Sequence, residues 1–597
     1  MKKIKLLTIL PTAAIALPFS VMSCDGGGQE NNSSTTTKLD LSAELNSVVV
    51  EYDGNKSILK PSEVKVEKIR ITGFGSEYEV EPNSINLVPH DDKGTLEVTF
   101  KLRQKNLVSN VQSKTVEIKN FLNSSGNVDK YKGYEHLVIE NDIVKGAKSI
   151  PAGGILEIPD GVTSIAAAAF SFKAGNLNTV VGSSVTKNQI TRVIIPDSVT
   201  TIGAAAFAEN VNLESVVMSK KVNKISEALF EGCVRLKTIN LPNEIDTIGN
   251  YAFLRCKALT KIDLPKNLTS LGSSIDLTAA KTFQGTSLTE ITIPANVKMI
   301  PTSTFEGCES LSKVTLNSKL EKVSWAAFKG CTSLTEINLP ENVKFIGKHA
   351  FLNCSNLAKV EMKNKVTEIK EGAFENVTAL KNITLSTALT TLSKEAFKNS
   401  GITTIALPAN LKAIEEGTFE NCTALTKVTM GNNITAINSK AFYNCGVLNS
   451  INLSTSLVKI QNNAFENTTN LSVVTFPTTI TLIDNGAFKN SGLVTLTVPG
   501  TLSNVEPESF MNCKKLTTVT FGTGWDNKDI KSKAFYGCDV LTTVTFASKV
   551  KNILKEAFFA CPLLKEVSIH KGTDWKTGLM NKNKAFDETI TTVKVIN

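Results

Sequence analysis

The stretch AFKGCTSLTEINLP, residues 327–340, decides the fold. It places a cysteine three residues after a phenylalanine, then a leucine, and then an alternating apolar run that ends at a proline. The same phrase returns as AFLNCSNLAKVEM from Ala350, TFENCTALTKVTM from Thr418 and AFYGCDVLTTVTF from Ala534. Self-similarity at a fixed period is the signature of repeat architectures. Whatever role Cys331 has in its repeat, the equivalent cysteines therefore have in theirs.

The repeats occupy the chain from about residue 151 to residue 597, and most steps between equivalent phenylalanines are 22 or 23 residues. The motif phenylalanines are Phe170, Phe207, Phe230, Phe253, Phe283, Phe305, Phe328, Phe351, Phe374, Phe397, Phe419, Phe442, Phe465, Phe488, Phe510, Phe535, Phe558 and Phe586. About eighteen copies in a fixed register predict a solenoid, in which each coil contacts only its neighbours. Stacking would bury each motif phenylalanine between neighbouring ones.

One coil can be read from the residues that follow Cys331. Residues 336–339 alternate polar and apolar side chains, which predicts a short strand. Ile346, Ala350 and Cys354 are four residues apart, a spacing that suits a helical turn. We therefore predict an α/β repeat solenoid in which strand, turn, short helical segment and return make one coil, preceded by a small all-β domain.

The pattern L-x-x-I-x-L-P-x-x-V-x-x-I-x-x-x-A-F-x-x-C closely resembles the BspA-like leucine-rich-repeat family, also described as the Treponema pallidum type. The resemblance implies a leucine-rich-repeat stack over residues 151–597 with parallel strands on its concave face. It also implies a surface protein of the adhesin kind. Two features depart from the family: no asparagine is kept after the strand, and the common phrase SVTSIG is only approximated, as in SVTTIG at Ser198.

The start of the chain has the pattern of a bacterial secretory signal. Lys2, Lys3 and Lys5 precede an apolar run over about residues 6–19, and VMSC follows with Cys24 as its last residue. This ending resembles a lipobox, which implies cleavage before Cys24 and a diacylglycerol on its sulfur. An ordinary signal peptide with a chance cysteine is the alternative. No other stretch is long and apolar enough to cross a bilayer.

These features divide the chain before the repeats. We expect residues 1–23 to be a lipoprotein signal peptide and residues 24–38, rich in Gly, Ser, Thr and Asn, to be a flexible tether. Residues 39–121 contain short alternating runs, which predict the small all-β domain. Residues 122–150 are expected to be a linker and an N-terminal cap of the solenoid.

The all-β domain carries a second resemblance. Alternating runs lie at VKVEKIRITGF (residues 64–74), TLEVTFKLR (residues 95–103) and TVEIKNF (residues 115–121). The phrases LKPSEV at Leu59, ITGF within the first run and GTLEVTFKLR at Gly94 are similar to the lipoprotein-associated domain of mycoplasma surface proteins.

Ten of the eleven cysteines occupy one position, three residues after a motif phenylalanine. They are Cys233, Cys256, Cys308, Cys331, Cys354, Cys422, Cys445, Cys513, Cys538 and Cys561. Other repeats place Asn210, Thr286, Val377, Ser400 or Thr468 there. A position that accepts all of these asks for a small and nearly buried group, so we predict a structural ladder of thiols. Disulfides between adjacent coils stay open as an alternative, because a strand spacing of about 4.8 Å permits them.

The sequence offers no catalytic constellation. The four histidines, His90, His136, His349 and His570, are scattered, and we find no zincin, nucleophile-elbow, phosphate-loop or C-x-x-C motif. We therefore expect no enzyme, no metal site and no cofactor. The formal net charge of +9 lacks the clustered Arg and Lys of a nucleic-acid-binding protein, so we expect no nucleic-acid partner.

The outward strand positions are the remaining candidates for function. The position of Glu336 alternates in sign through Lys313, Glu336 and Lys359, while the next outward position is rich in threonine. We predict that these positions bind a protein or a glycan, and the candidate ligand-binding residues are Lys313, Glu336, Asn338, Lys359, Thr384, Thr429 and Thr475. The alternative is that threonine is simply a good exposed strand former.

Irregular repeats are further candidates, because insertions in a solenoid collect on loops. The step from Phe170 to Phe207 is about 14 residues too long, and that from Phe253 to Phe283 about 7. Trp525 falls in the register of core residue Val343, so we expect it to pack inside.

Two classes of function remain. The first is an exported protein, anchored by Cys24 to the extracellular face of the cell membrane, that acts as an adhesin for a host or bacterial surface protein or glycan. The second is a structural or antigenic coat protein that binds nothing.

Overall fold

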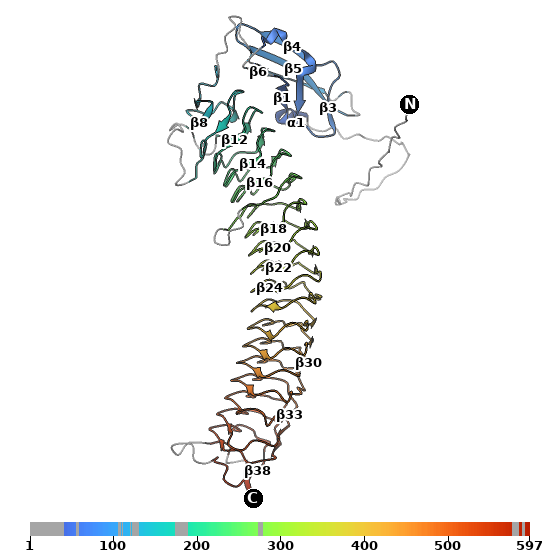
Figure 1. Ribbon diagram of the computed structural model, residues 1–597, viewed down its shortest axis with the longest axis vertical. Helices are drawn as coiled ribbons and strands as arrows, with labels where there is room; N and C mark the ends of the chain where they lie inside the picture. The colour runs from blue at the N-terminus through green and yellow to red at the C-terminus, as the bar shows by residue number, and fades with distance from the viewer. Residues whose placement is uncertain are drawn as a thin grey trace, which may run out of the picture. The chain divides into compact units, whose positions relative to one another are not determined.

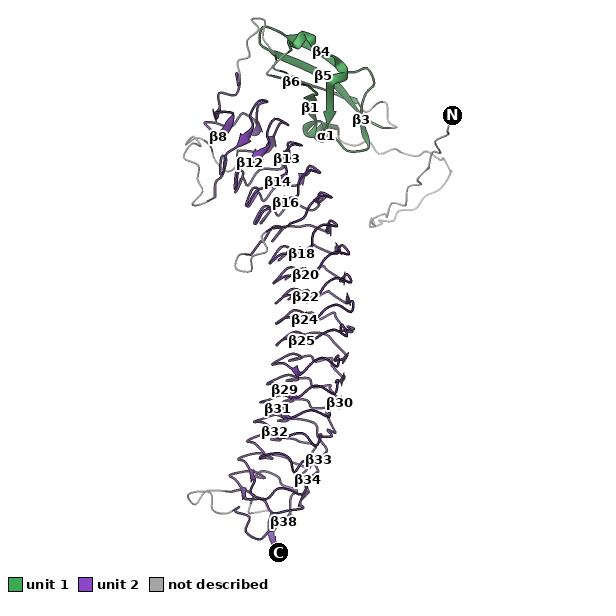
Figure 2. Cartoon of the chain, in the orientation of Figure 1, with its two compact units in different colours: residues 1–129 green, residues 130–597 purple. Residues whose placement is uncertain are grey.

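The computed structural model describes residues 41–597, except residues 55, 57–58, 106–108, 110, 120, 122–130, 174–184, 186–188, 273–278, 576–583 and 588–590 (Figure 1). The chain divides into two compact units, residues 1–129 and residues 130–597 (Figure 2). The predicted leader, Cys24 and the tether lie outside the described residues, as do most of the residues inserted after Phe170. Their assignments stay predictions.

The first unit is built on antiparallel strands. Its elements are α1 (Leu41–Ser47), β1 (Val49–Tyr52), the short 3₁₀ turns η2 (Pro61–Glu63) and η3 (Val66–Lys68), β2 (Ile69–Thr72), β3 (Tyr78–Val80), β4 (Asn86–His90), β5 (Thr95–Gln104) and β6 (Val111–Ile118). β1 pairs with β2, while β5 pairs with β3, β4 and β6. Phe100 and Leu102 of β5 are fully buried and centre one of its two small cores.

Two details of this unit differ from the sequence prediction. The run over residues 64–74 is a strand only in β2, since η3 occupies its first half. The unit also begins with α1, whose Leu41 and Leu45 pack on the core next to Phe100. Alternation alone does not separate a short strand from a 3₁₀ turn followed by a strand.

The second unit is a stack of coils with two parallel sheet rows along it (Figure 1). The first row, which we call the first sheet, contains β9 (Ile155–Glu157), β11 (Arg192–Ile194), β13 (Ser215–Val217), β15 (Thr238–Ile239), β17 (Glu290–Thr292), β19 (Lys313–Thr315), β21 (Glu336–Asn338), β23 (Lys359–Glu361), β26 (Thr404–Ala406), β28 (Lys427–Thr429), β30 (Ser450–Asn452), β33 (Thr495–Val498), β34 (Thr518–Phe521), β36 (Thr543–Phe546), β38 (Glu566–His570) and β39 (Thr592–Ile596). The row consists of groups of two to four strands, and within each group successive strands pair in parallel and in register, as Glu336 with Lys359.

The second sheet consists of shorter strands from the same coils. An antiparallel hairpin, β7 (Leu137–Glu140) and β8 (Ile143–Ala147), begins it. The strands that follow are β10 (Ser164–Ile165), β12 (Thr201–Ile202), β14 (Lys224–Ile225), β16 (Thr247–Ile248), β18 (Met299–Ile300), β20 (Lys322–Val323), β22 (Phe345–Ile346), β24 (Glu368–Ile369), β25 (Thr391–Leu392), β27 (Ala413–Ile414), β29 (Ala436–Ile437), β31 (Lys459–Ile460), β32 (Leu482–Ile483), β35 (Asp529–Ile530) and β37 (Asn552–Ile553).

The prediction of a short helical segment in each coil is wrong. Ile346 lies in β22, and the residues from Gly347 to Cys354 form tight turns, with no helix among the described residues of the second unit. In every repeat from Phe207 to Phe558, the residues two before and two after the motif phenylalanine have positive φ, as His349 and Asn353 do at 53° and 61°. A left-handed residue interrupts a right-handed helix, so two in each coil exclude one.

The motif phenylalanines form a continuous ladder, as predicted. Each ring stacks on the next, with centroids 4.9 to 5.8 Å apart, from Phe170 through to Phe586. The rings are within 22° of parallel and all are buried. This spacing is close to the separation of neighbouring parallel strands, so one coil advances by one strand.

The thiol ladder is also confirmed. All ten repeat cysteines are buried and free. Each sulfur lies 3.0 to 3.5 Å from the carbonyl oxygen of the motif phenylalanine in the preceding repeat, and Cys331 donates to Phe305 in this way at 3.2 Å. Asn210 uses its side-chain amide for the same bond to Phe170. The position therefore selects small side chains, most of which can donate a hydrogen bond.

Candidate binding surfaces

The outward side chains of the first sheet, with the equivalent positions in repeats that lack a named strand, form a surface that we call the first face. All seven candidate ligand-binding residues lie on it and are exposed, and Thr384 and Thr475 stand in repeats without a named strand of the first sheet. The inward residues of the same strands, such as Ile337, are buried. The seven residues span eight repeats, so the structure places them along one face rather than around one point.

The charges at the centre of the first face are only partly paired with one another. Lys359 lies 2.7 Å from Glu361 and 3.9 Å from Glu336. The hydrogen bond and charge of Glu361 raise the pKa of Lys359, and Lys359 lowers the pKa of Glu361. Lys313 lies in register with Glu290, but no carboxylate of the described chain comes within 4 Å of its amine. The alternating charges therefore do not fully neutralise one another at Lys313.

A shallow hollow interrupts the first face beside Lys313. Its lining includes three lysines, two acidic residues and the apolar side chains between them, in a volume of about 500 Å³. The charged residues are Lys261, Asp263, Lys266, Glu290 and Lys313. Residues 261–263, between β15 and β17, form no strand, and they belong to the long step from Phe253 to Phe283. A basic recess therefore lies on the first face at this irregular step.

A second hollow lies on the second sheet and was missed by the sequence analysis. We call it the aromatic–lysine hollow, and its lining residues are Thr302, Lys322, Ser324, Trp325, Phe345, Gly347, Lys348, Lys370, Glu371, Ser393 and Lys394. Trp325 is 50% exposed, the most exposed aromatic side chain among the large hydrophobic residues of the described chain. The amines of Lys322 and Lys370 lie 4.9 and 5.6 Å from the centre of the Phe345 ring. Aromatic rings and ammonium groups are thus brought together by three successive repeats.

Comparison with known families agrees with this architecture. The model of the BspA type leucine rich repeat region, with six copies, matches residues 183–275, 278–403, 390–517 and 505–576, which is more than half of the chain. The chain belongs to the BspA-type leucine-rich-repeat family. The model of the lipoprotein associated domain matches residues 38–123, which include the first unit's strands. Both resemblances found in the sequence are confirmed.

Several solved structures are similar to this BspA-type chain in fold. A leucine-rich repeat protein from Bacteroides ovatus is 23% identical, with 77% of this chain and 97% of that chain covered and a TM-score of 0.47. A leucine rich cell surface protein from Faecalibacterium prausnitzii is 20% identical, with 69% and 93% covered and a TM-score of 0.32. The pneumococcal vaccine antigen PcpA is 18% identical, with 77% and 95% covered and a TM-score of 0.27. None of the curated proteins matches the chain.

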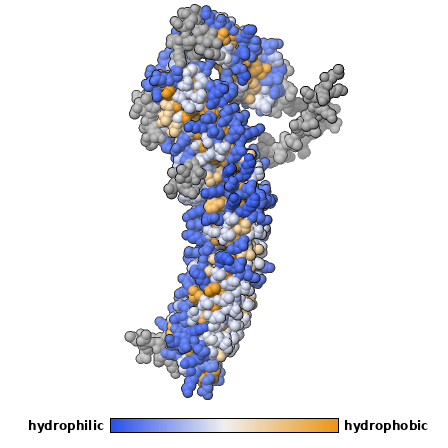
Figure 3. Space-filling model, in the orientation of Figure 1, coloured by the Kyte–Doolittle hydropathy of each residue, from blue (hydrophilic) through white to orange (hydrophobic). Residues whose placement is uncertain are grey.

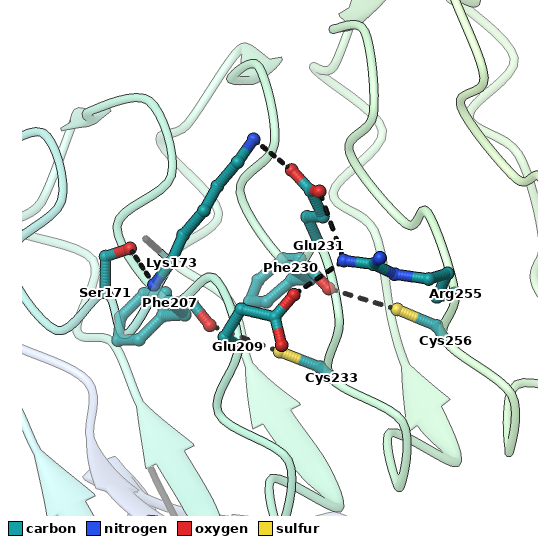
Figure 4. Close-up of polar contacts among 9 residues, drawn as sticks. All are labelled: Ser171, Lys173, Phe207, Glu209, Phe230, Glu231, Cys233, Arg255 and Cys256. Atoms are coloured by element: carbon teal, nitrogen blue, oxygen red, sulfur yellow. Dashed lines mark hydrogen bonds and ion pairs between the residues drawn. The ribbon is translucent and has the colours of Figure 1, made fainter. Parts of the chain in front are cut away.

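An ion network around the buried Glu231 joins the first BspA-type repeats and was not foreseen (Figure 4). The Glu231 side chain is only 7% exposed, and its carboxylate forms ion pairs with Lys173 at 2.6 Å and Arg255 at 3.4 Å. Arg255 also contacts Glu209 at 2.6 Å. Figure 4 shows Lys173 and Arg255 converging on Glu231 from different coils. Because every charge has an opposite partner, this network serves as a clamp between coils and not as a ligand site.

The described BspA-type repeats contain few other candidates for chemistry. No group of three His, Cys, Asp or Glu side chains in the described chain is placed to hold a metal ion. No helix within the described residues is long and apolar enough to span a membrane. Trp525 is fully buried against Phe521, as predicted, and His349, one of the scattered histidines, is partly buried.

A simple signal could have found the aromatic–lysine hollow. Trp325 occupies the position three residues after the first residue of a second-sheet strand, where the next repeats have Lys348, Glu371 and Lys394. A tryptophan at a position that other repeats fill with charges is an exposed aromatic side chain. The sequence analysis could not use this signal, because it did not recognise the second strand that sets the register.

Proposed function

We propose that the protein is an exported, lipid-anchored cell-surface binding protein, an adhesin that holds a host or neighbouring-cell protein or glycan on the first face. The observation that carries this proposal is the basic recess beside Lys313. It lies on the exposed first face, and its lysines outnumber its acidic residues. Solenoids present extended surfaces of this kind to their partners.

The recess has the properties of a recognition surface. Its lysines are Lys261, Lys266 and Lys313, and the partly exposed apolar side chains of Leu264 and Pro294 also line it. Complementary charge accelerates association and selects the partner. A partner with acidic groups and a small apolar contact therefore fits best.

Two features of the N-terminal part of the chain support a cell-surface location. The sequence there has a secretory pattern that ends at Cys24, and the domain that follows matches the lipoprotein associated domain. Two acyl chains hold a protein firmly where one would not. The lipid on Cys24 would leave the repeats outside the cell, available to a partner.

A coat protein without a partner is the second candidate. It is favoured by the pairing of Lys359 with Glu361 and Glu336, because charges that satisfy one another leave less field for a partner. The largely hydrophilic surface of the repeats in Figure 3, with small separate hydrophobic areas, also suits a spacer that stays soluble.

Binding of the purified full-length protein distinguishes the two candidates. Labelled protein is applied to immobilised animal extracellular matrix, to cultured epithelial cells and to whole bacteria. An adhesin binds at least one of them saturably, and an excess of unlabelled protein competes for the same sites. Binding that rises linearly with concentration on all three, without competition, would favour the coat protein.

A further inference from the structure

We propose that the aromatic–lysine hollow binds an acidic oligosaccharide, in which sugar rings that carry carboxylates alternate with neutral rings. The hollow lies on the second sheet and uses none of the seven candidate residues of the first face. The inference therefore stands beside the proposed function of the first face and does not depend on it.

The shape of the hollow follows from the register of the second sheet. β18, β20, β22 and β24 pair in parallel, so that Lys322 lies beside Phe345 and Phe345 beside Glu368. Two positions after the strand start, Ser324 and Gly347 form a low floor, and a Cβ on Gly347 would lie 2.5 Å from the carbonyl carbon of Ser324. The resulting volume of about 690 Å³ is within the range of small-molecule sites.

The walls of the hollow are aromatic. Trp325 and Phe345 both line it, and half of the Trp325 side chain is exposed. An exposed tryptophan that adds nothing to the core marks a binding surface more often than a structural one. The flat face of an indole fits the apolar C–H face of a sugar ring, and the ring hydroxyls then point toward the polar rim.

The rim of the hollow is basic. Four lysines and one glutamate line it: Lys322, Lys348, Lys370, Lys394 and Glu371. Lys348 and Lys394 share Glu371 at 3.1 and 3.6 Å, so one carboxylate faces two ammonium groups. Lys370 also lies 2.6 Å from Glu368, so four lysines face two carboxylates. The net charge is still positive, which favours a ligand that carries carboxylates.

The spacing of the lysines favours an alternating polymer. Lys322 and Lys370 come from coils two apart, as do Lys348 and Lys394. At about 4.8 Å for each coil, each pair of attachment points is about 10 Å apart along the stack. This is roughly the length of a disaccharide, so a carboxylate on every second ring meets a lysine at each end.

A peptide fits the hollow less well than a sugar. The backbone N–H groups of the floor are already used, since Ser324 donates to Ile300 at 3.0 Å and Gly347 to Val323 at 2.7 Å. The lining side chains offer many donors but few free acceptors for the N–H groups of a peptide. The carboxylates of an acidic sugar need hydrogen-bond donors, which the lysines supply. The sugar hydroxyls can bond to the hydroxyls of Thr302 and Ser393.

The test uses three probes with the purified full-length protein. The acidic probe is a hyaluronan hexasaccharide, in which every second ring is a uronate. The neutral probe is chitohexaose, which has a similar length without carboxylates, and the peptide probe is hexaglutamate. Binding is measured by calorimetry at low and high salt. We expect the hyaluronan probe to bind at least about tenfold more tightly than either of the others, with affinity falling as salt rises.

Variants connect the binding to the hollow. Trp325→Ala and the double variant Lys322→Gln with Lys370→Gln are each expected to weaken hyaluronan binding at least about tenfold. The matched control is Lys224→Gln with Lys459→Gln, because these lysines also begin second-sheet strands but stand in repeats without the aromatic pair. Thermal unfolding confirms that each variant is folded, and the half-exposed Trp325 contributes little to the core.

Each other outcome overturns the proposal. Equal binding by Trp325→Ala and the unmodified protein places the ligand elsewhere. Equal affinity for chitohexaose removes the requirement for acid, and equal affinity for hexaglutamate replaces the oligosaccharide with an acidic peptide. Absence of binding by all three probes rejects a ligand site of this chemistry altogether.

Discussion

A residue with positive φ stands two positions after each motif phenylalanine from Phe207 to Phe558, and it determines how a coil turns back. Eight of these positions are asparagine, at residues 353, 376, 399, 421, 444, 467, 490 and 512. Asparagine tolerates this conformation better than other residues with a Cβ. Its side chain adds a second benefit, because Asn444 donates to Asn421 at 2.8 Å and accepts from Asn467 at 2.6 Å.

Replacing one member of this asparagine ladder separates its two roles. Asn444→Ala loses both side-chain hydrogen bonds and strains the backbone at φ 59°, so we expect the free energy of unfolding to fall by about 1 to 3 kcal/mol. Asn444→Gly loses the same bonds but adopts positive φ freely, so it should cost less than alanine. Urea unfolding of the two variants measures the difference. Equal costs for alanine and glycine would show that backbone strain is unimportant here.

Ionisation of the buried thiols should lower the stability of the protein at alkaline pH. Burial raises the pKa of Cys308 and Cys422 to about 11, above the value of about 8.5 expected for an unfolded chain. Each thiol therefore adds stability that is fully present below about pH 8.5 and is lost as the pH rises toward 11.

Replacement of these two cysteines tests the predicted loss of stability at alkaline pH. Cys308→Thr with Cys422→Thr removes two titrating groups while keeping a side chain that other repeats use, as at Thr286. Between pH 8.5 and 10.5 the free energy of unfolding should fall less steeply in the variant, by up to about 1.4 kcal/mol per pH unit for each thiol. Urea unfolding over this range, with Ser491→Thr as a control without loss of a thiol, measures the slopes. Identical slopes would contradict the assignment.

At the scale of the element, the strand of the first sheet could be predicted and the second strand could not. Residues 336–338 alternate as a strand must, and their core position fixed the register of the whole ladder. Phe345 and Ile346 make only a two-residue strand, too short for any alternation to be visible. The spacing of Ile346, Ala350 and Cys354 suggested a helix, because two successive tight turns return side chains to one side as a helical turn does.

The candidate surfaces divide in the same way. Exposure on the first face was predictable, since outward positions follow directly from the inward ones. The basic recess and the aromatic–lysine hollow were not, because each depends on how side chains from several coils meet. Lys261 and Lys313 lie far apart in the sequence, and Trp325 was recognisable only after the second sheet gave it a register.

The clamp formed by Lys173, Glu209, Glu231 and Arg255 predicts the effect of a substitution at Gly232. Gly232 and Gly330 occupy the same repeat position with φ of 72° and 73°, but an added Cβ would lie 2.5 Å from the Glu209 carboxylate at Gly232 and at an ordinary contact distance of 3.7 Å from Gly307 at Gly330. Both alanine variants bear the strain of positive φ. Gly232→Ala must also displace Glu209 from Arg255, so it should be less stable than Gly330→Ala by about 0.5 kcal/mol or more.

Paired thermal and urea unfolding of the two glycine variants tests this expectation. Because the backbone strain is common to both, the difference between them reports the clamp alone. High salt should reduce the difference, since it screens the ion pair of Glu209 with Arg255. Equal stability of the two variants at low salt would mean that the clamp adds nothing.

At the scale of the whole molecule, the second unit is a stack in which each coil contacts only its neighbours. The phenylalanine ladder, the thiol ladder and both sheets repeat with the same step, so each coil presents the same contacts to the next. Stability in such a stack accumulates coil by coil. Removal of one complete coil should therefore leave a folded stack with the register intact.

Two deletions test this expectation. Deleting residues 374–396 joins Ala373 to Phe397 and removes one 23-residue coil, so the protein should fold with a modest loss of stability. Deleting residues 374–384 removes half a coil and places polar residues in the core, so it should unfold part of the stack. Circular dichroism and limited proteolysis distinguish the two. Similar disruption by both deletions would contradict a modular stack.

The central claim is that the first face binds a partner at the basic recess beside Lys313. The most direct test measures saturable binding of the full-length protein to epithelial cells or matrix, at low and high salt, for Lys313→Glu and two matched variants. Lys427→Glu alters the same position of another Lys-Val-Thr strand outside the recess, and Lys459→Glu alters the second sheet. We predict that Lys313→Glu weakens binding several-fold at low salt, Lys427→Glu less, and Lys459→Glu not at all. Unchanged binding by Lys313→Glu at both salt concentrations would contradict the account.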